Sequence, residues 1–113
     1  MNSLGKKKIL RIYIDSEDKY NKKPLWEEIL KKVKEEQIAG ATVFKAIAGM
    51  GPKAHLRAFN VFVLSEELPI VIEIIDTQEK IEKFVITLDD MIEEGLVTIT
   101  DTEVIQYKHK DDK

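Results

Sequence analysis

Segments with the periodicity of strands and segments with the periodicity of helices alternate along this chain, and their order restricts its fold. The first half has the order strand, helix, strand, and after a loop the second half has the same order. The segments are residues 9–14, 25–33 and 41–47 in the first half, and 70–75, 78–93 and 96–100 in the second. This β-α-β, loop, β-α-β order is typical of the ferredoxin-like fold of the α+β class, a four-stranded antiparallel sheet with two helices on one face.

Individual residues indicate where the helices begin and end. Pro24 suits the first position of the first helix, because the N–H that proline lacks would have no partner there. Gly40 is expected to end that helix, and Gly95 to end the second. Asp76 and Glu79 have the spacing of a capping box, which predicts that Asp76 caps the second helix.

Length and composition predict a single domain with few of the common chemical sites. The 113 residues include no cysteine, so there is no disulfide, thiolate metal site or cysteine nucleophile. A net charge of −3 argues against nucleic-acid binding, which needs a basic field. No apolar run is long enough to enter a membrane as a span, and the expected location is the cytoplasm. The many lysines, glutamates and isoleucines resemble the composition of hyperthermophile proteins.

The two ends of the domain, which spans 1–113, are expected to be less ordered than its centre. Residues 1–7 and 108–113 are predicted to be flexible tails, and the lysine cluster at 6–8 a solvated leader. Between the last predicted strand and the second tail, residues 102–107 are expected to add a small edge strand.

Apolar residues occupy both faces of the predicted strands, although two helices can cover only one face. The second face of the first strand carries Ile9 and Tyr13, and that of the strand at 70–75 carries Val71 and Ile75. Such a face needs a cover, and in so small a chain another copy of the chain is the simplest one. We therefore predict a homo-oligomer.

The loop after the second predicted strand concentrates glycines and cations. Glycine allows a backbone to approach a ligand closely, and lysine, histidine and arginine donate hydrogen bonds to anions. The residues concerned are Gly49, Met50, Gly51, Lys53, His55 and Arg57. They are interpreted as a site for phosphate or carboxylate, and the alternative is an ordinary exposed turn.

Other reactive groups are few. Glu73 is the one ionisable residue in a strongly apolar strand, so its carboxylate needs water, a cation or a donor; a structural ion pair to Arg11 or Arg57 and a ligand contact are both open. An enzyme that uses His55 and Arg57 on a phosphorylated substrate is an alternative function, and a module that binds no small ligand is another. No catalytic residue and no metal site is expected.

Three ordered motifs resemble those of a known family. They are Gly-Ala-Thr-Val at 40–43, Gly-Met-Gly at 49–51 and Leu-Pro-Ile-Val-Ile-Glu at 68–73. In this order they resemble the PII signal-transduction proteins, and more closely the PII-like group known as domain of unknown function 190. The resemblance extends from about Lys8 to Tyr107.

This resemblance implies a homotrimer with ligand sites between neighbouring subunits. In PII proteins the adenine base lies against the strands that correspond here to Thr42 and to Glu73, Ile74 and Ile75. Their phosphates meet the base of the long loop, which corresponds to residues 49–51. The cations at Lys53, His55 and Arg57 then lie in the same segment.

The departures from the PII pattern favour a smaller ligand. PII proteins have a second glycine-rich phosphate loop with a lysine, whereas this chain has Gly95 after Glu93 and Glu94. AMP is therefore expected to bind better than ATP, and no other cofactor is required. The 49–60 loop is expected to change conformation when the ligand binds and so to regulate a partner protein. The expected partner is a membrane transporter, because relatives in the family are often associated with membrane transport. The loop contains no tyrosine for nucleotidylylation.

Overall fold

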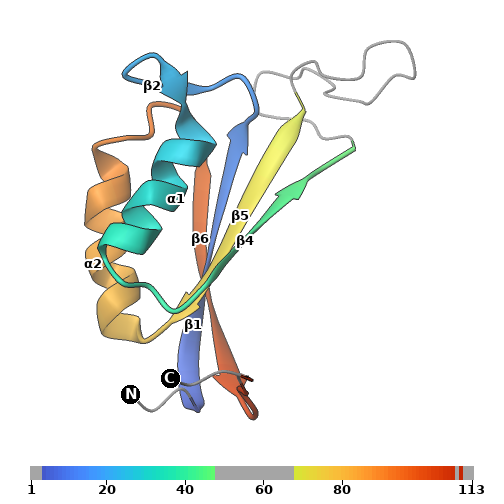
Figure 1. Ribbon diagram of the computed structural model, residues 1–113, viewed down its shortest axis with the longest axis vertical. Coiled ribbons are helices and arrows are strands. Elements are labelled where there is room, and N and C mark those ends of the chain that lie inside the picture. Colours follow the sequence, from blue (N-terminus) through green and yellow to red (C-terminus); the bar gives the residue numbers. More distant parts are fainter. Residues whose placement is uncertain (1–3, 48–67, 109, 111–113) are drawn as a thin grey trace.

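The computed structural model describes residues 4–47, 68–108 and 110. These form a four-stranded antiparallel sheet in the order β4-β5-β1-β6, with both helices on one face (Figure 1). The sheet strands are β1 Gly5–Asp15, β4 Ala41–Lys45, β5 Pro69–Asp76 and β6 Leu96–Val104. The helices are α1 Leu25–Glu35 and α2 Gln78–Asp89, and a small hairpin joins β2 Lys19–Tyr20 to β3 Lys23–Pro24. The predicted ferredoxin-like arrangement is confirmed.

The core lies between the sheet and the helices. Alternate residues of the central strands β1 and β5 are buried there, because successive side chains in a strand point to opposite faces. The fully enclosed side chains include Leu10, Ile12, Ile72, Ile74, Ile29, Ile81 and Phe84. Helix α1 buries Leu25, Ile29 and Val33, as its apolar stripe predicts.

Strand β1 is longer than its apolar alternation indicates. It begins at Gly5, so residues 5–7 belong to the sheet and the prediction of a flexible tail over 1–7 is wrong for them. Residues 6–8 likewise form strand rather than a solvated leader. They pair with the far end of β6, where Lys6 lies opposite Glu103 and Lys8 opposite Asp101. Strand β6 is correspondingly continuous to Val104, and the separate edge strand expected over 102–107 does not form.

All four helix ends differ from prediction. Helix α2 ends at Asp89 with Asp90 as its C-cap, so it stops short of Glu93, and Gly95 does not end it but immediately precedes β6. Pro24 precedes α1 as its N-cap instead of occupying its first position. Helix α1 ends at Glu35, and the following turn contains Gln37 at a φ of 56°, so Gly40 does not end it. At the start of α2 the cap is Thr77, whose hydroxyl accepts a hydrogen bond from the Lys80 N–H at 3.3 Å. Asp76 is therefore free for another role.

The β2–β3 hairpin before α1 was not expected. Its two-residue turn, Asn21 and Lys22, has φ values of 52° and 68°. Two positive φ values in succession match the twist of a tight hairpin, and asparagine adopts them more readily than most residues.

The face of the sheet away from the helices carries an apolar row across all four strands. In the strand register Phe44 lies beside Val71, Val71 beside Tyr13, and Tyr13 beside Leu96. Opposed residues share a face, so these four side chains are neighbours. Phe44 is 49% exposed and Leu96 56% exposed, which leaves the row without a cover in the single chain.

Candidate functional site

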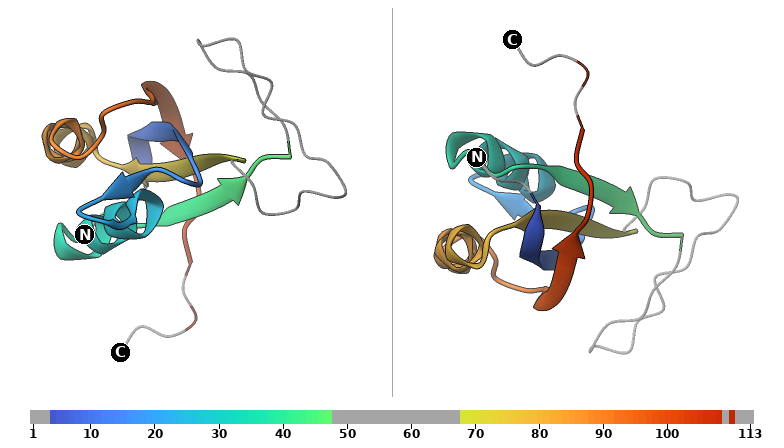
Figure 2. Two further views of the ribbon diagram at one scale, coloured as in Figure 1. Left: turned by 90° about the horizontal axis from the view of Figure 1, so that it is seen from above. Right: turned by 90° about the horizontal axis from the view of Figure 1, so that it is seen from below.

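A pocket of about 410 Å³ lies on this open face, where β4 begins and β5 ends. Its far wall is the segment after β6, which crosses to the β4 side of the molecule when seen from below (Figure 2, right). The lining residues are Lys7, Ala39, Gly40, Ala41, Thr42, Glu73, Ile75, Asp76, Val104, Gln106 and Tyr107. The start of the Gly-Ala-Thr-Val motif and the end of the apolar strand thus meet at one cavity.

A polar row crosses the sheet next to the apolar one and enters the pocket. Thr42 is paired with Glu73, and Glu73 with Arg11. The Arg11 Nε donates to Glu73 Oε2 at 3.0 Å. Both side chains are partly buried, since the Glu73 side chain is 26% exposed and the Arg11 side chain 33% exposed. The structural ion pair considered for Glu73 therefore forms. A carboxylate has lone pairs beyond this one bond, so a ligand contact is compatible with the pair.

Ile75 and Ile74 lie on opposite faces of β5. Ile75 shares the open face with Glu73 and lines the pocket. Ile74 is on the opposite face, fully buried in the core with no exposed area. Its side chain therefore cannot touch a ligand in this pocket, and its inclusion among the predicted site residues is wrong. The period of two in a strand separates these neighbours.

Asp76 closes the pocket at the end of β5. It is 2% exposed, its Oδ1 accepts a hydrogen bond from the Thr77 N–H at 2.7 Å, and its Oδ2 accepts one from the Ala39 N–H at 2.8 Å. Sequence reasoning treated it as a helix cap. The signal that could have found it is the alternation of β5, which places position 76 on the buried face together with Ile72 and Ile74.

The predicted phosphate-binding residues fall outside the described part of the chain. These are Gly49, Met50, Gly51, Lys53, His55 and Arg57. The described strands show where that segment leaves the sheet, since β4 ends at Lys45 and the Ala46 N–H donates to the Pro69 carbonyl at 2.9 Å. Thr42 and Lys45 are three residue steps apart along the strand, which corresponds to about 10 Å.

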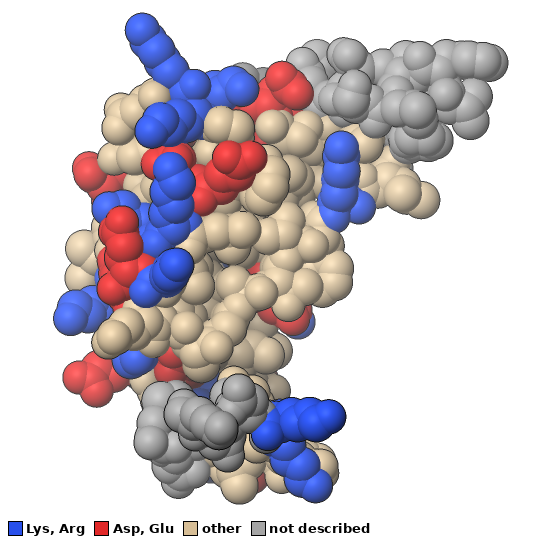
Figure 3. Space-filling model, in the orientation of Figure 1, with Lys and Arg blue, Asp and Glu red and all other residues tan. Residues whose placement is uncertain are grey.

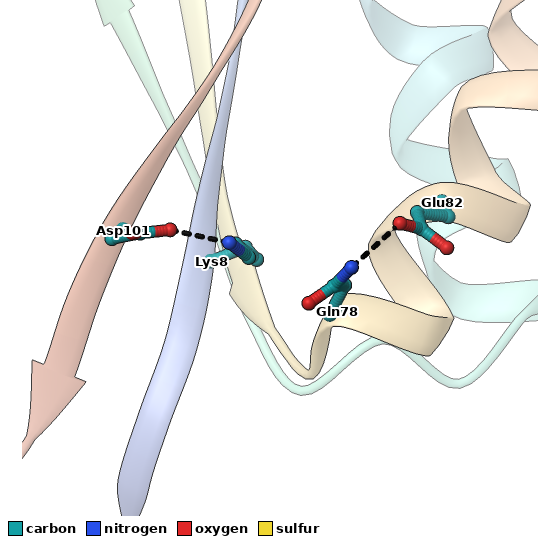
Figure 4. A network of polar contacts seen from close by, with 4 residues as sticks. All are labelled: Lys8, Gln78, Glu82 and Asp101. Carbon is teal, nitrogen blue, oxygen red and sulfur yellow. Dashed lines mark hydrogen bonds and ion pairs between the residues drawn. The ribbon is translucent and has the colours of Figure 1, made fainter.

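Basic side chains gather at the end of the sheet where β1 begins, at the lower end of Figure 3. Lys7 reaches the pocket, and its Nζ donates to the Leu4 carbonyl at 3.1 Å. Lys8 forms an ion pair with Asp101 of the neighbouring strand (Figure 4). The hydrogen bond and charge of Lys8 lower the pKa of Asp101 below its ordinary value. Lys7, Gln106 and Tyr107 are pocket residues that sequence reasoning did not find.

Neither a metal-binding cluster nor a membrane-spanning helix is present among the described residues. These residues contain no cluster of three or more histidine, aspartate or glutamate side chains able to hold a metal ion. In the same residues no helix is long and apolar enough to cross a membrane.

Comparison with known proteins identifies the family. The model of the DUF190 family, described as "Uncharacterized ACR", matches residues 7–104. The chain belongs to this PII-like family. A UPF0166 protein of Aquifex aeolicus is 42% identical over 100 residues, which cover 88% of this chain and 94% of that protein. A UPF0166 protein of Methanocaldococcus jannaschii is 40% identical over 100 residues, covering 88% and 92%.

Solved structures share the fold of this DUF190 member at low sequence identity. One of them is CPII, a nitrogen regulatory PII-like protein from Thiomonas intermedia K12, which was solved bound to ADP, AMP and bicarbonate. CPII is 17% identical to this chain with a TM-score of 0.66, and the match covers 91% of this chain and 99% of CPII. The apo form of CPII has a TM-score of 0.62 at 18% identity, covering 90% and 95%. At this identity the likeness establishes the PII-like fold.

Proposed function

We propose that this DUF190 protein is a regulator that binds an adenine nucleotide in the pocket at the start of β4. The observation that carries the proposal is the meeting of Thr42, Glu73 and Ile75 at one cavity. These are three of the positions at which the resemblance to PII proteins puts the adenine base. The fold of CPII, solved with ADP and AMP, supports the same ligand class.

The dimensions of the pocket suit a nucleotide base. Its volume of about 410 Å³ is within the range of about 300–1,000 Å³ for small-molecule sites. Small aliphatic residues line one side, and Glu73 and Thr42 offer polar groups that can fix the orientation of a ring. Lys7 and Gln106 add donors at the rim.

The nucleotide would run along β4. With the base at Thr42, its phosphate would point toward the other end of the strand, about 10 Å away. The 49–51 segment follows that end, and its glycines and the cations at Lys53, His55 and Arg57 suit phosphate. This direction makes the loop the part that senses the phosphate.

AMP is the favoured nucleotide because Gly95 serves packing rather than phosphate binding. A β-carbon at Gly95 would lie 2.8 Å from the Tyr13 carbonyl oxygen and 3.2 Å from the Ile14 Cγ2. The glycine therefore allows close contact with β1. With Glu93 and Glu94 before it, this turn has no cation to offer a second or third phosphate.

A homotrimer would complete the site. The pocket opens onto the same face as the uncovered apolar row, so a copy that covers the row also approaches the pocket. Burial of exposed Phe44 and Leu96 would favour association. A trimer follows the PII arrangement, in which the ligand lies between subunits.

Regulation would work through differential binding. A nucleotide that binds one conformation of the 49–60 loop stabilises it by RT ln(1 + [L]/Kd), and a partner that recognises this conformation then responds to nucleotide concentration. A membrane transporter is the partner class that the resemblance favours.

Isothermal titration calorimetry with AMP, ADP and ATP tests the nucleotide proposal. We expect saturable binding of one AMP per chain, with affinity falling from AMP to ATP. Absence of heat with all three, or ATP binding tighter than AMP, would reject it. Nucleotide recovered unchanged after long incubation would agree with a binding protein, whereas hydrolysis that is lost in His55→Ala would favour the enzyme alternative.

A further inference from the structure

Asp76 is a buried carboxylate at the wall of the pocket, and it accepts hydrogen bonds from two separate backbone segments. Among the residues that the structure describes, it is the one charged side chain classed with the core, at 2% exposed. A buried charge is costly unless it is hydrogen-bonded. Asp76 compensates this cost with two backbone donors, the Ala39 N–H and the Thr77 N–H.

The two donors come from different parts of the fold. Thr77 follows Asp76 and begins α2, whereas Ala39 belongs to the connection between α1 and β4. The ladder between β4 and β5 starts only at Ala41, so Ala39 lies before the first strand pair. The carboxylate thus joins the connection to the end of β5 at a point that the sheet does not reach.

Helix capping does not explain this carboxylate. Thr77 already provides the cap of α2 through its hydroxyl. The connection has a second tie to the same helix, because the Lys80 Nζ donates to the Gln37 carbonyl at 2.7 Å. Both ties fix the segment that leads into residues 39–42, which form one wall of the pocket.

We propose that Asp76 is a positioning residue for the nucleotide site, which sets the width of the pocket by holding the 39–42 wall through the Ala39 N–H. The proposal rests on the proposed nucleotide function. The two N–H groups donate to different oxygens of the carboxylate, Ala39 to Oδ2 and Thr77 to Oδ1, so in this geometry both oxygens must be acceptors. Asparagine has one acceptor oxygen, and its NH₂ group would face the other N–H.

Asp76→Asn tests this role by calorimetry with AMP, at a temperature where the variant is folded. We expect AMP to bind at least about tenfold more weakly, since a lost charge-assisted hydrogen bond frees the wall. Thr77→Ala is the matched control, because it removes the α2 cap but leaves the Ala39 contact. It should lower the melting temperature and keep the wild-type affinity.

Hydrogen exchange of the wild-type protein provides a second readout that does not depend on a variant. The Ala39 amide should be protected before AMP is added, and its exchange should accelerate in Asp76→Asn but not in Thr77→Ala. Free exchange of Ala39 in the wild type, or equal AMP affinity in Asp76→Asn and Thr77→Ala, would overturn the role of Asp76. If the wild type binds no nucleotide, the proposed nucleotide function is rejected. If the wild type binds AMP but Asp76→Asn binds it as tightly as Thr77→Ala does, only the role of Asp76 is rejected.

Discussion

Gly95 and Gly40 show that two glycines of similar appearance in the sequence can have unrelated roles. A β-carbon at Gly95 would meet the Tyr13 carbonyl at 2.8 Å, whereas a β-carbon at Gly40 would meet no atom within 4 Å. Gly95 is therefore required by packing. Gly40 is open and borders the pocket.

We predict that Gly95→Ala lowers the free energy of unfolding by about 1–3 kcal/mol, because β1 or the turn must shift to admit the methyl group. The Gly40→Ala control should be neutral or stabilising by up to about 1 kcal/mol, since it only restricts the unfolded chain. Chemical denaturation of both variants at one protein concentration measures the difference. Equal stability of the two would contradict the packing role.

The Lys8–Asp101 pair makes a prediction about pH. Because Lys8 lowers the pKa of Asp101, the stabilisation from the pair is present above the ordinary aspartate pKa and is lost as pH falls through the lowered value. Asp101 is 84% exposed, so the effect on stability is small. An NMR titration should show the Asp101 carboxyl titrating at lower pH in the wild type than in Lys8→Gln; identical midpoints would exclude the pair in solution.

Residue roles that depend on local pattern were predictable, and those that depend on distant partners were not. The isolated charge of Glu73 in an apolar strand required a partner, and Arg11 is that partner. Asp76 was misassigned because its spacing to Glu79 imitates a capping box, whereas one of its two backbone donors, the Ala39 N–H, is 37 positions away. Ile74 was misplaced because a resemblance marks a segment, not a face of a strand.

Among the elements, periodicity predicted both helices and all four sheet strands, but not their ends. The first residues of β1 and the last residues of β6 lack apolar alternation. They form strand because they pair with each other in the sheet. Opposite charges face across this part of the ladder, with Lys6 opposite Glu103 and Lys8 opposite Asp101. Cross-strand pairs of this kind stabilise a sheet, and no local window of sequence contains both partners.

The apolar row on the open face makes a prediction about association. Leu96→Glu places a charge in the row and should shift the protein from oligomer to monomer, because the charge would be buried without a partner. Ile86→Glu is the control, since Ile86 is 74% exposed on α2, outside the row. Light scattering coupled to size-exclusion chromatography measures both. A monomeric wild type, or an oligomer unaffected by Leu96→Glu, would contradict the covered-face interpretation.

For the whole molecule, both helices occupy one side of the sheet (Figures 1 and 2). The open pocket and the uncovered apolar row lie on the other side. Sequence patterns predicted an apolar face opposite the helices. Thr42, Glu73 and Ile75, which the family resemblance put among the expected ligand residues, line the pocket on that face. Sequence patterns did not predict the wall formed by Gln106 and Tyr107, because the course of the chain after β6 depends on the end of a strand that local pattern placed too early.

The central claim, that AMP occupies the pocket at the start of β4, is tested most directly by titrating AMP into the wild type and into Gly40→Leu. Gly40 lines the pocket and is unconfined, so leucine should narrow the site while leaving the fold intact. The account predicts saturable AMP binding to the wild type and a loss of at least about tenfold, or about 1.4 kcal/mol, in the variant, with an unchanged melting temperature. Equal affinities in the two proteins, or no binding to the wild type, would contradict it.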